Sequence, residues 1–145
     1  KIRFNSIEVI NSKGISVDQV FVGENIKIKL NFDINSKIDW NRFIVSIIFY
    51  DLYENIMCAF PSDEMGCNFE NIEKNQIILN IPFLGLRPNN YMISLYTFCG
   101  STHTSDANDI ITNAFSLEVL SDNIHNSGKT IRSMNCAFIN ANFEL

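Results

Sequence analysis

The feature that most constrains the fold is the stretch Ile26–Ile34, which reads Ile-Lys-Ile-Lys-Leu-Asn-Phe-Asp-Ile. Every second residue is apolar, and every residue between them is charged or polar. Because side chains alternate across a strand, this pattern predicts a strand with one face in the core and the other in water. A helix would scatter the same apolar positions around its circumference. The stretch therefore indicates a protein built from two β layers.

Short extended stretches separated by turn residues continue along the rest of the chain. Residues 43–50 are apolar on both faces, as expected of a central strand. Residues 2–10 alternate with a slip near Asn5 and Ser6 that suits a β-bulge. Further strands are predicted at residues 15–22, 56–60, 76–81, 91–98 and 110–120. Nothing has helical period over a useful length, so the chain is predicted to be an all-β, two-sheet antiparallel sandwich of immunoglobulin-like or jelly-roll-like topology.

The chain divides into a body and a tail near residue 120. Residues 1–120 account for the sandwich, and the start of segment 121–145 is typical of a linker. The remainder is strand-like and carries too much apolar surface to leave in water, namely Ile131, Met134, Cys136, Phe138, Ile139 and Phe143. An added strand would satisfy the backbone groups of an edge strand. We therefore expect a C-terminal strand that pairs with its own body or is exchanged with a second copy.

Composition excludes several classes of protein. The chain has 145 residues, 46% of them hydrophobic, which is enough for one domain with a real core. A net charge of −5 without a run of Lys or Arg argues against nucleic acid as a partner. No apolar run approaches the ~18 residues of a membrane span, and the start does not resemble a signal peptide. Because the chain begins with Lys1 rather than Met, we expect it to be an excised piece of something longer.

Motifs for metal binding and catalysis are weak. The four cysteines lack paired spacing, which favours free thiols in a reducing compartment. Cys99 and His103 make one zinc-like pair, whereas a structural zinc site needs two. Residues 126–130 contain Gly-Lys-Thr, but the leading Gly of a phosphate-binding loop is replaced by Asn123 and no helix is predicted to follow. No nucleophile with a base and no facing pair of carboxylates stands out. We therefore predict no metal, no cofactor and no enzymatic activity.

Three pieces of the chain look like a known family. They are residues 21–28 with Gly23-Glu24, residues 77–82 followed by Leu84-x-Leu86-x-Pro88-x-Asn90-Tyr91, and residues 113–119 with Phe115-x-Leu117-x-Val119. Together, over about residues 4–120, they resemble the C-terminal carbohydrate-binding domain of the Wzt-type ATP-binding subunits of O-antigen ABC transporters. Asn90 stands where the family usually has Gly before Tyr, and Asn tolerates the same left-handed turn. The tail also lacks a clear Trp near its end.

The resemblance implies a non-catalytic domain that recognises the non-reducing end of an O-antigen polysaccharide before export. It implies a homodimer with an exchanged C-terminal strand. It further implies attachment to an ATP-binding domain and, through it, to a membrane permease, in the cytoplasm at the bacterial inner membrane. The alternative from another class is a structural or protein-interaction module, such as an adhesin-type domain.

One predicted face is the best candidate for sugar binding. If residues 43–50, 91–98 and 110–120 are neighbouring strands, one surface combines Ile44, Ser46, Ile48, Tyr50, Met92, Ser94, Tyr96, Phe98, Ala114, Ser116 and Glu118. Sugar binding needs flat aromatic rings and polar groups placed around the hydroxyls. The predicted carbohydrate-binding residues on this face are Tyr50, Ser46, Ser94, Tyr96, Glu118 and Ser116. The alternative is that a partner chain or the tail covers this face.

Loop residues add three further candidates for carbohydrate contact. They are Trp40, Arg42 and His103. A loop Trp is more often a partly buried anchor than a stacking platform, and Arg42 is more often a solvated charge than a partner of an anionic sugar.

Overall fold

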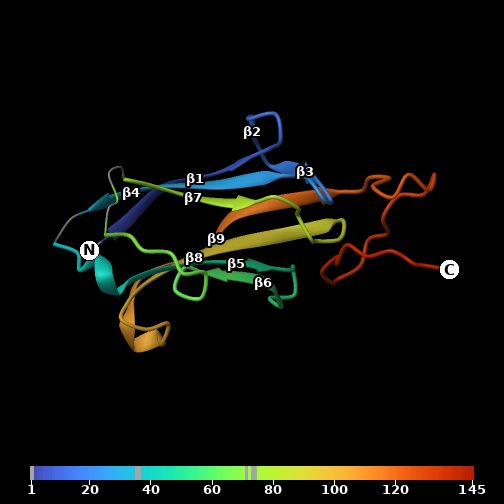
Figure 1. The fold of residues 1–145 in the computed structure, drawn as a ribbon. Coiled ribbons are helices and arrows are strands. Elements are labelled where there is room, and N and C mark those ends of the chain that lie inside the picture. Colours follow the sequence, from blue (N-terminus) through green and yellow to red (C-terminus); the bar gives the residue numbers. More distant parts are fainter. Residues whose placement is uncertain (1, 35–36, 71, 73–74) are drawn as a thin grey trace.

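The computed structural model describes residues 2–34, 37–70, 72 and 75–145. Two sheets pack face to face (Figure 1), which confirms the all-β sandwich. The four-stranded sheet, called sheet A, has the order β2 (Ser16–Val17), β1 (Ile2–Ile10), β4 (Ile26–Ile34), β7 (Gln76–Ile81). The five-stranded sheet, called sheet B, has the order β3 (Gln19–Phe21), β9 (Ala107–Leu120), β8 (Asn89–Cys99), β5 (Phe43–Tyr50), β6 (Ile56–Pro61). Two short 3-10 turns, η1 (Trp40–Arg42) and η2 (Thr104–Asp106), precede β5 and β9, and the described residues contain no α-helix.

The core lies between the inner faces of the two sheets. On β4, Ile26, Ile28, Leu30 and Phe32 are each no more than 1% exposed, so the predicted alternation is confirmed up to Phe32, whereas Ile34 at the strand end is 39% exposed. Facing them, β8 contributes Tyr91, Ile93 and Leu95, which are also fully buried. Burial of apolar surface from both layers is the main stabilising contribution.

Most predicted strands lie where the sequence placed them. The slip near Asn5 and Ser6 is a bulge in the pairing of β1 with β4, between Phe4 and Ser6. The stretch predicted at residues 15–22 is instead two strands, β2 and β3, which belong to different sheets. β3 runs parallel to β9, whereas the other described pairs of strands are antiparallel.

A bulge in β9 changes which of its residues face outward. Ile93 pairs with Phe115 and Leu95 pairs with Ile111, so residues 112–114 lie opposite Ser94 alone. Asn113 adopts a positive φ of 52° at this point. As a result Ala114, predicted on the outer face, packs against the core. Phe115 beside it also packs against the core and is half-buried.

The tail does not form the strand predicted in residues 130–145. Its described residues make one isolated bridge, between Ala137 and Leu86, and are otherwise irregular. Figure 1 shows this segment beyond one end of the sandwich, opposite the N-terminus. The physical reason is spacing: Ile131, Met134 and Phe138 recur at intervals of three and four residues, and a strand would not place them on one face.

One residue of the tail, Phe138, anchors it to the body of the same chain. The Phe138 N–H donates to the Gly85 carbonyl at 2.7 Å, and the side chain is 8% exposed. A Cβ on Gly85 would lie 2.7 Å from the Phe138 carbonyl oxygen, so glycine is needed for this close approach. Beyond the anchor, Ile139, Phe143 and Leu145 are exposed.

Candidate functional site

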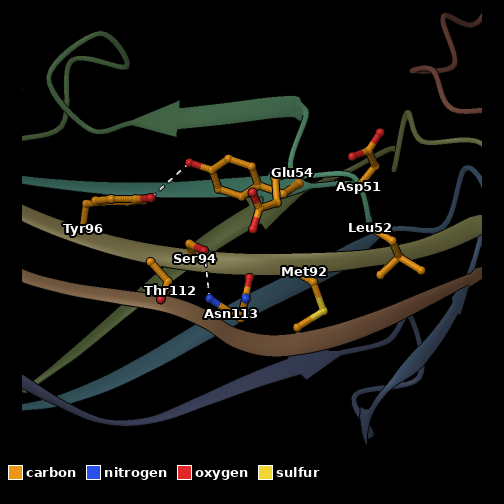
Figure 2. A pocket seen from close by; sticks show the side chains of 9 residues that line it. Asp51, Leu52, Glu54, Met92, Ser94, Tyr96, Thr112 and Asn113 are labelled. Carbon is orange, nitrogen blue, oxygen red and sulfur yellow. Dashed lines mark hydrogen bonds between the residues drawn. The ribbon is translucent and has the colours of Figure 1, made fainter.

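A depression of about 600 Å³ lies on the outer face of sheet B (Figure 2). Strands β5, β8 and β9 are neighbours, as predicted, and the turn after β5 completes the rim. The depression is lined by Tyr50, Asp51, Leu52, Glu54, Met92, Ser94, Tyr96, Thr112 and Asn113. Cross-strand pairing sets their spacing, since Tyr50 is opposite Met92 on β8.

Two tyrosines form the aromatic part of this depression. The hydroxyls of Tyr50 and Tyr96 are 3.0 Å apart and share a hydrogen bond, which Figure 2 marks by a dashed line. The Tyr96 ring also stacks on Phe98, with ring centroids 6.1 Å apart and an interplanar angle of 5°. Burial, and then the hydrogen bond with Tyr96, raises the pKa of Tyr50 to about 12, so this phenol is neutral at physiological pH. Both rings are held in place and half-exposed.

The β9 bulge supplies polar groups beside the tyrosines. The Asn113 N–H donates to Ser94 Oγ at 3.0 Å, and Figure 2 shows this contact next to Thr112. Ser94 itself is 1% exposed, so its role is to hold the bulge in place and not to contact a ligand. Thr112 and Asn113 are exposed and present their side chains to the depression.

The two carboxylates on the rim have different roles. Asp51 accepts hydrogen bonds from the N–H groups of Tyr53 and Asn55 at 2.9 and 2.8 Å, and from the Asn55 side chain at 3.0 Å. These contacts, the Asn55 side chain first, lower the pKa of Asp51 and hold the turn. Glu54, at a positive φ of 65°, is exposed on that turn. In Figure 2 Glu54 lies over the strands, whereas the Asp51 carboxylate points away from them.

Three other predicted residues of this face lie outside the depression. Ser46 on β5 lies opposite Tyr96 on β8 and is only 4% exposed. Ser116 is exposed and lies opposite Met92, so it borders the depression. Glu118 accepts a hydrogen bond from the Gln19 side chain at 2.7 Å, which ties β9 to β3.

The loop candidates lie at the other end of sheet B. Phe43, next to η1, pairs with Cys99, and the eight-residue β5 separates it from Tyr50 by roughly 23 Å. Trp40 packs edge-on against Phe43 with ring centroids 5.2 Å apart, and it is half-buried. The Arg42 carbonyl accepts from Gly100 at 2.7 Å, and His103 Nδ1 contacts the Ser105 hydroxyl at 2.8 Å. The structure therefore does not bring Trp40, Arg42 or His103 together with the tyrosine pair.

Sequence reasoning missed several of the lining residues. Thr112 and Asn113 enter the depression only because the bulge turns them outward, and Asn at 113 was a usable signal because Asn tolerates positive φ. Leu52 and Glu54 belong to the turn after Tyr50, where Asp51 followed by Asn55 was the signal for a turn closed by its own side chains.

Metal-binding clusters and membrane-spanning helices are absent from the described part of the chain. It contains no group of three or more His, Cys, Asp or Glu side chains arranged to hold a metal ion. It contains no helix long and apolar enough to span a membrane. The four cysteines form no disulfide.

Comparison with known proteins adds a family to this geometry. A family model described as the Wzt C-terminal domain matches residues 1–132. The chain belongs to the Wzt C-terminal domain family. Among solved structures it is similar to one described as "Crystal structure of the C-terminal domain of wzt", with a TM-score of 0.73 and 11% identity over 99% of this chain and 83% of that chain. At this identity the likeness shows the fold. No curated protein matches the chain.

Membership in the Wzt C-terminal domain family confirms the resemblance carried by Gly23-Glu24 and by the stretch from Leu84 to Tyr91. At the level of the family it supports a carbohydrate-binding role in O-antigen export by a non-catalytic domain. The family match also extends past residue 120 into the tail.

Proposed function

We propose that this domain binds the non-reducing terminal residues of an O-antigen polysaccharide in the depression on sheet B. The observation that carries this proposal is the Tyr50–Tyr96 pair, two rings joined by a hydroxyl contact of 3.0 Å on an outer sheet face. Aromatic faces pack against the C–H side of a pyranose, and phenol hydroxyls exchange hydrogen bonds with its hydroxyls. Thr112, Asn113 and Glu54 add polar groups around the same space.

The lining also favours an uncharged terminal sugar. None of the nine described lining residues is Lys, Arg or His, whereas Asp51 and Glu54 are both acidic. An anionic sugar would therefore be repelled without a cation to pair with it. A neutral sugar instead offers hydroxyls that donate to Glu54 and to the tyrosine oxygens.

In an O-antigen exporter, this domain would recognise a completed polysaccharide. Family membership supports attachment to an ATP-binding domain, and through it to a membrane permease, on the cytoplasmic side of the bacterial inner membrane. Binding of the non-reducing end would then select completed polysaccharide for transport. No step of this role needs a catalytic group.

We also propose that two copies form a homodimer through the tail. Ile139 and Phe143 are 85% and 97% exposed and Leu145 is fully exposed, and this apolar surface is unfavourable in water. Sheet A ends at β7 and sheet B ends at β6, so each sheet offers an edge to an added strand. Exchange of the segment that follows the Phe138 anchor, residues 139–145, would bury these side chains and produce a closed two-fold assembly.

A protein-interaction module is the second candidate, because apolar side chains also gather near the depression. Leu52, Tyr53 and Ile56 are 59%, 76% and 61% exposed around the turn after β5. A protein partner would cover this rim, whereas a sugar would use the tyrosine pair. A Tyr53→Ser variant changes the rim without changing a lining residue, and full affinity of that variant for the polysaccharide would favour the sugar role for the tyrosines.

Calorimetric titration with the cognate polysaccharide tests the sugar site. Tyr96→Ala removes the stacking ring and is expected to weaken binding about ten-fold, corresponding to roughly 1–2 kcal/mol. Tyr96→Phe keeps the ring and loses only the hydroxyl contact, so its loss should be smaller. Trp40→Ala, at the far end of the sheet, is the matched aromatic control and should bind as the wild type does. Unchanged affinity in a folded Tyr96→Ala would place the site elsewhere.

Light scattering at tens of micromolar tests the dimer. The full chain is expected to have the mass of two copies, and a chain ending at residue 138, which keeps the buried Phe138 anchor, the mass of one. A monomeric full chain would exclude strand exchange. A truncated chain that still dimerises would move the interface into the sandwich body.

A further inference from the structure

We propose that a second pocket, at the end of the sandwich where the tail leaves it, binds a phosphoryl group. This pocket has a volume of about 260 Å³. Its lining is mostly basic and polar, with two apolar side chains, and consists of Arg87, His125, Ser127, Lys129, Thr130, Ile131, Arg132 and Met134. It shares no lining residue with the depression on sheet B, so the proposal is independent of the sugar site.

The charge of the pocket contrasts with that of the chain. The whole chain carries 16 acidic and 11 basic residues, yet three of the basic ones line this pocket with no Asp or Glu among the lining residues. Among the described residues, the salt bridge joins Lys29 to Glu8 at 3.8 Å on sheet A. Arg87, Lys129 and Arg132 therefore have no described carboxylate within salt-bridge distance. Like charges held together repel one another, and a bound anion relieves that repulsion.

Arg87 is held in place before any ligand arrives. Its carbonyl accepts a hydrogen bond from the buried Tyr91 hydroxyl. Its guanidinium donates to the Arg132 carbonyl at 3.3 Å and lies 5.7 Å from the centre of the Phe138 ring. That single donated bond leaves most of the five N–H donors of the guanidinium available for the two-point contact that suits phosphate oxygens.

The loop that carries the other two cations is closed by its own hydrogen bonds. Asn123 Oδ1 accepts from the Ser127 N–H at 2.9 Å, and the Ser121 hydroxyl donates to the Ile131 carbonyl at 2.6 Å. Gly128 adopts a φ of 79°, which turns the chain between Ser127 and Lys129. The neighbouring carboxylate, Asp122, accepts from the Asn123 N–H at 2.8 Å and does not line the pocket. Lys129 and Arg132 are thereby presented to the same space as Arg87.

The size and donors of the pocket favour a phosphoryl group over other anions. Its volume is below the ~300–1,000 Å³ typical of pockets for drug-sized ligands, so it suits a small group. Three cations and the Thr130 hydroxyl match the several acceptor oxygens of a phosphate better than the two of a carboxylate, while the Ser127 hydroxyl donates to the Lys129 carbonyl. A soluble phosphate ester and the headgroup of an anionic lipid share this chemistry.

NMR titration of the isotope-labelled full chain tests the soluble source. Inorganic phosphate and glycerol 1-phosphate, each against sodium chloride at matched ionic strength, are expected to shift the amide signals of residues 125–132. Lys129→Gln and Arg132→Gln should weaken this binding about ten-fold or more, because each removes a charge-assisted contact. Lys27→Gln, which removes an exposed cation on sheet A, is the matched control and should bind as the wild type does.

Sedimentation with vesicles tests the lipid source. Vesicles of phosphatidylcholine alone are compared with vesicles that also contain phosphatidylglycerol. Binding to the anionic vesicles that Lys129→Gln loses, without binding of free phosphate, assigns the pocket to a lipid headgroup. Binding of free phosphate without vesicle binding assigns the pocket to a soluble phosphate ester. Binding of both free phosphate and anionic vesicles shows that the pocket accepts a phosphoryl group from either source. Equal binding by Lys129→Gln and wild type, or no binding in both experiments, overturns the proposal.

Discussion

The outer faces of the two sheets differ although their inner faces are alike. On sheet A the polar side chains satisfy one another in rows across the strands. Asn31 donates to Ser6 at 2.9 Å and accepts from Gln76 at 3.2 Å, and Lys29 lies 3.8 Å from Glu8. A face whose polar groups already have partners and whose charges are solvated has little left to offer a ligand.

On sheet B the corresponding rows contain aromatic rings. Ser46 pairs with Tyr96 on one row, and Tyr50 pairs with Met92 on another. The rings are half-exposed, and the hydroxyls bond mainly to each other. The two sheets therefore cannot be distinguished by their buried side chains. The face suited to a ligand is the one with exposed aromatic rings and adaptable polar groups.

The largest effect is expected where the two sheets are alike. Leu30→Ala on β4 and Leu95→Ala on β8 each remove a side chain that is no more than 1% exposed. Each should lower the free energy of unfolding by roughly 2–5 kcal/mol, through lost burial and a residual cavity. Urea denaturation measures it. A much smaller loss on one sheet than on the other would show that the inner faces are not equivalent.

A smaller effect is expected at the bulge that separates the two outer faces. Asn113 has a φ of 52°, so Asn113→Ala should cost about 1 kcal/mol of stability, whereas Asn113→Gly keeps the conformation accessible. The alanine variant should also bind polysaccharide more weakly than the glycine variant, because the bulge positions Thr112. Thermal unfolding and calorimetry test both statements. Equal behaviour of the two variants would contradict a role for the positive φ.

The tyrosine pair has an expected signature in alkaline solution. Because the folded pKa of Tyr50 is raised to about 12 from 10.0, the stability that its neutral form contributes is complete below pH 10. That contribution is lost as the pH rises through 12. The difference in tyrosinate absorbance between the wild type and Tyr50→Phe reports the ionisation of Tyr50. This difference should therefore develop near pH 12, and it should develop at lower pH when Tyr96→Phe is also present. An absorbance difference with its midpoint near pH 10 would contradict the environment described for Tyr50.

The smallest effect is expected on the outer face of sheet A. Lys29→Ala removes a partly exposed ion pair with Glu8, which is worth about 0–1 kcal/mol. Polysaccharide affinity should not change, in contrast to Tyr96→Ala. Denaturation in low and high salt, together with calorimetry, checks both. A loss of affinity here would remove the distinction between the two outer faces.

The sequence alone determined the layers of this protein and most of their strands. The alternation in Ile26–Ile34 and the apolar run in Phe43–Tyr50 are local patterns, with the relevant residues one or two positions apart. Because the same short-range geometry decides which face a side chain occupies, such patterns can be read without knowing the partner strand. Placing Tyr50, Ser94 and Tyr96 on one face needed only the further assumption that their strands are neighbours.

Only the tertiary structure decided what depends on pairing between distant segments. Whether Thr112 and Asn113 face outward depends on where β9 slips against β8, and that register is a property of both strands. Trp40 and Tyr50 are ten positions apart in the sequence, yet the extended strand between them keeps them at opposite ends. Arg87 joins Lys129 and Arg132 only because the tail turns back and Phe138 docks at Gly85. Burial and long-range electrostatics act between residues that the chain brings together only when it folds, so no local pattern records them.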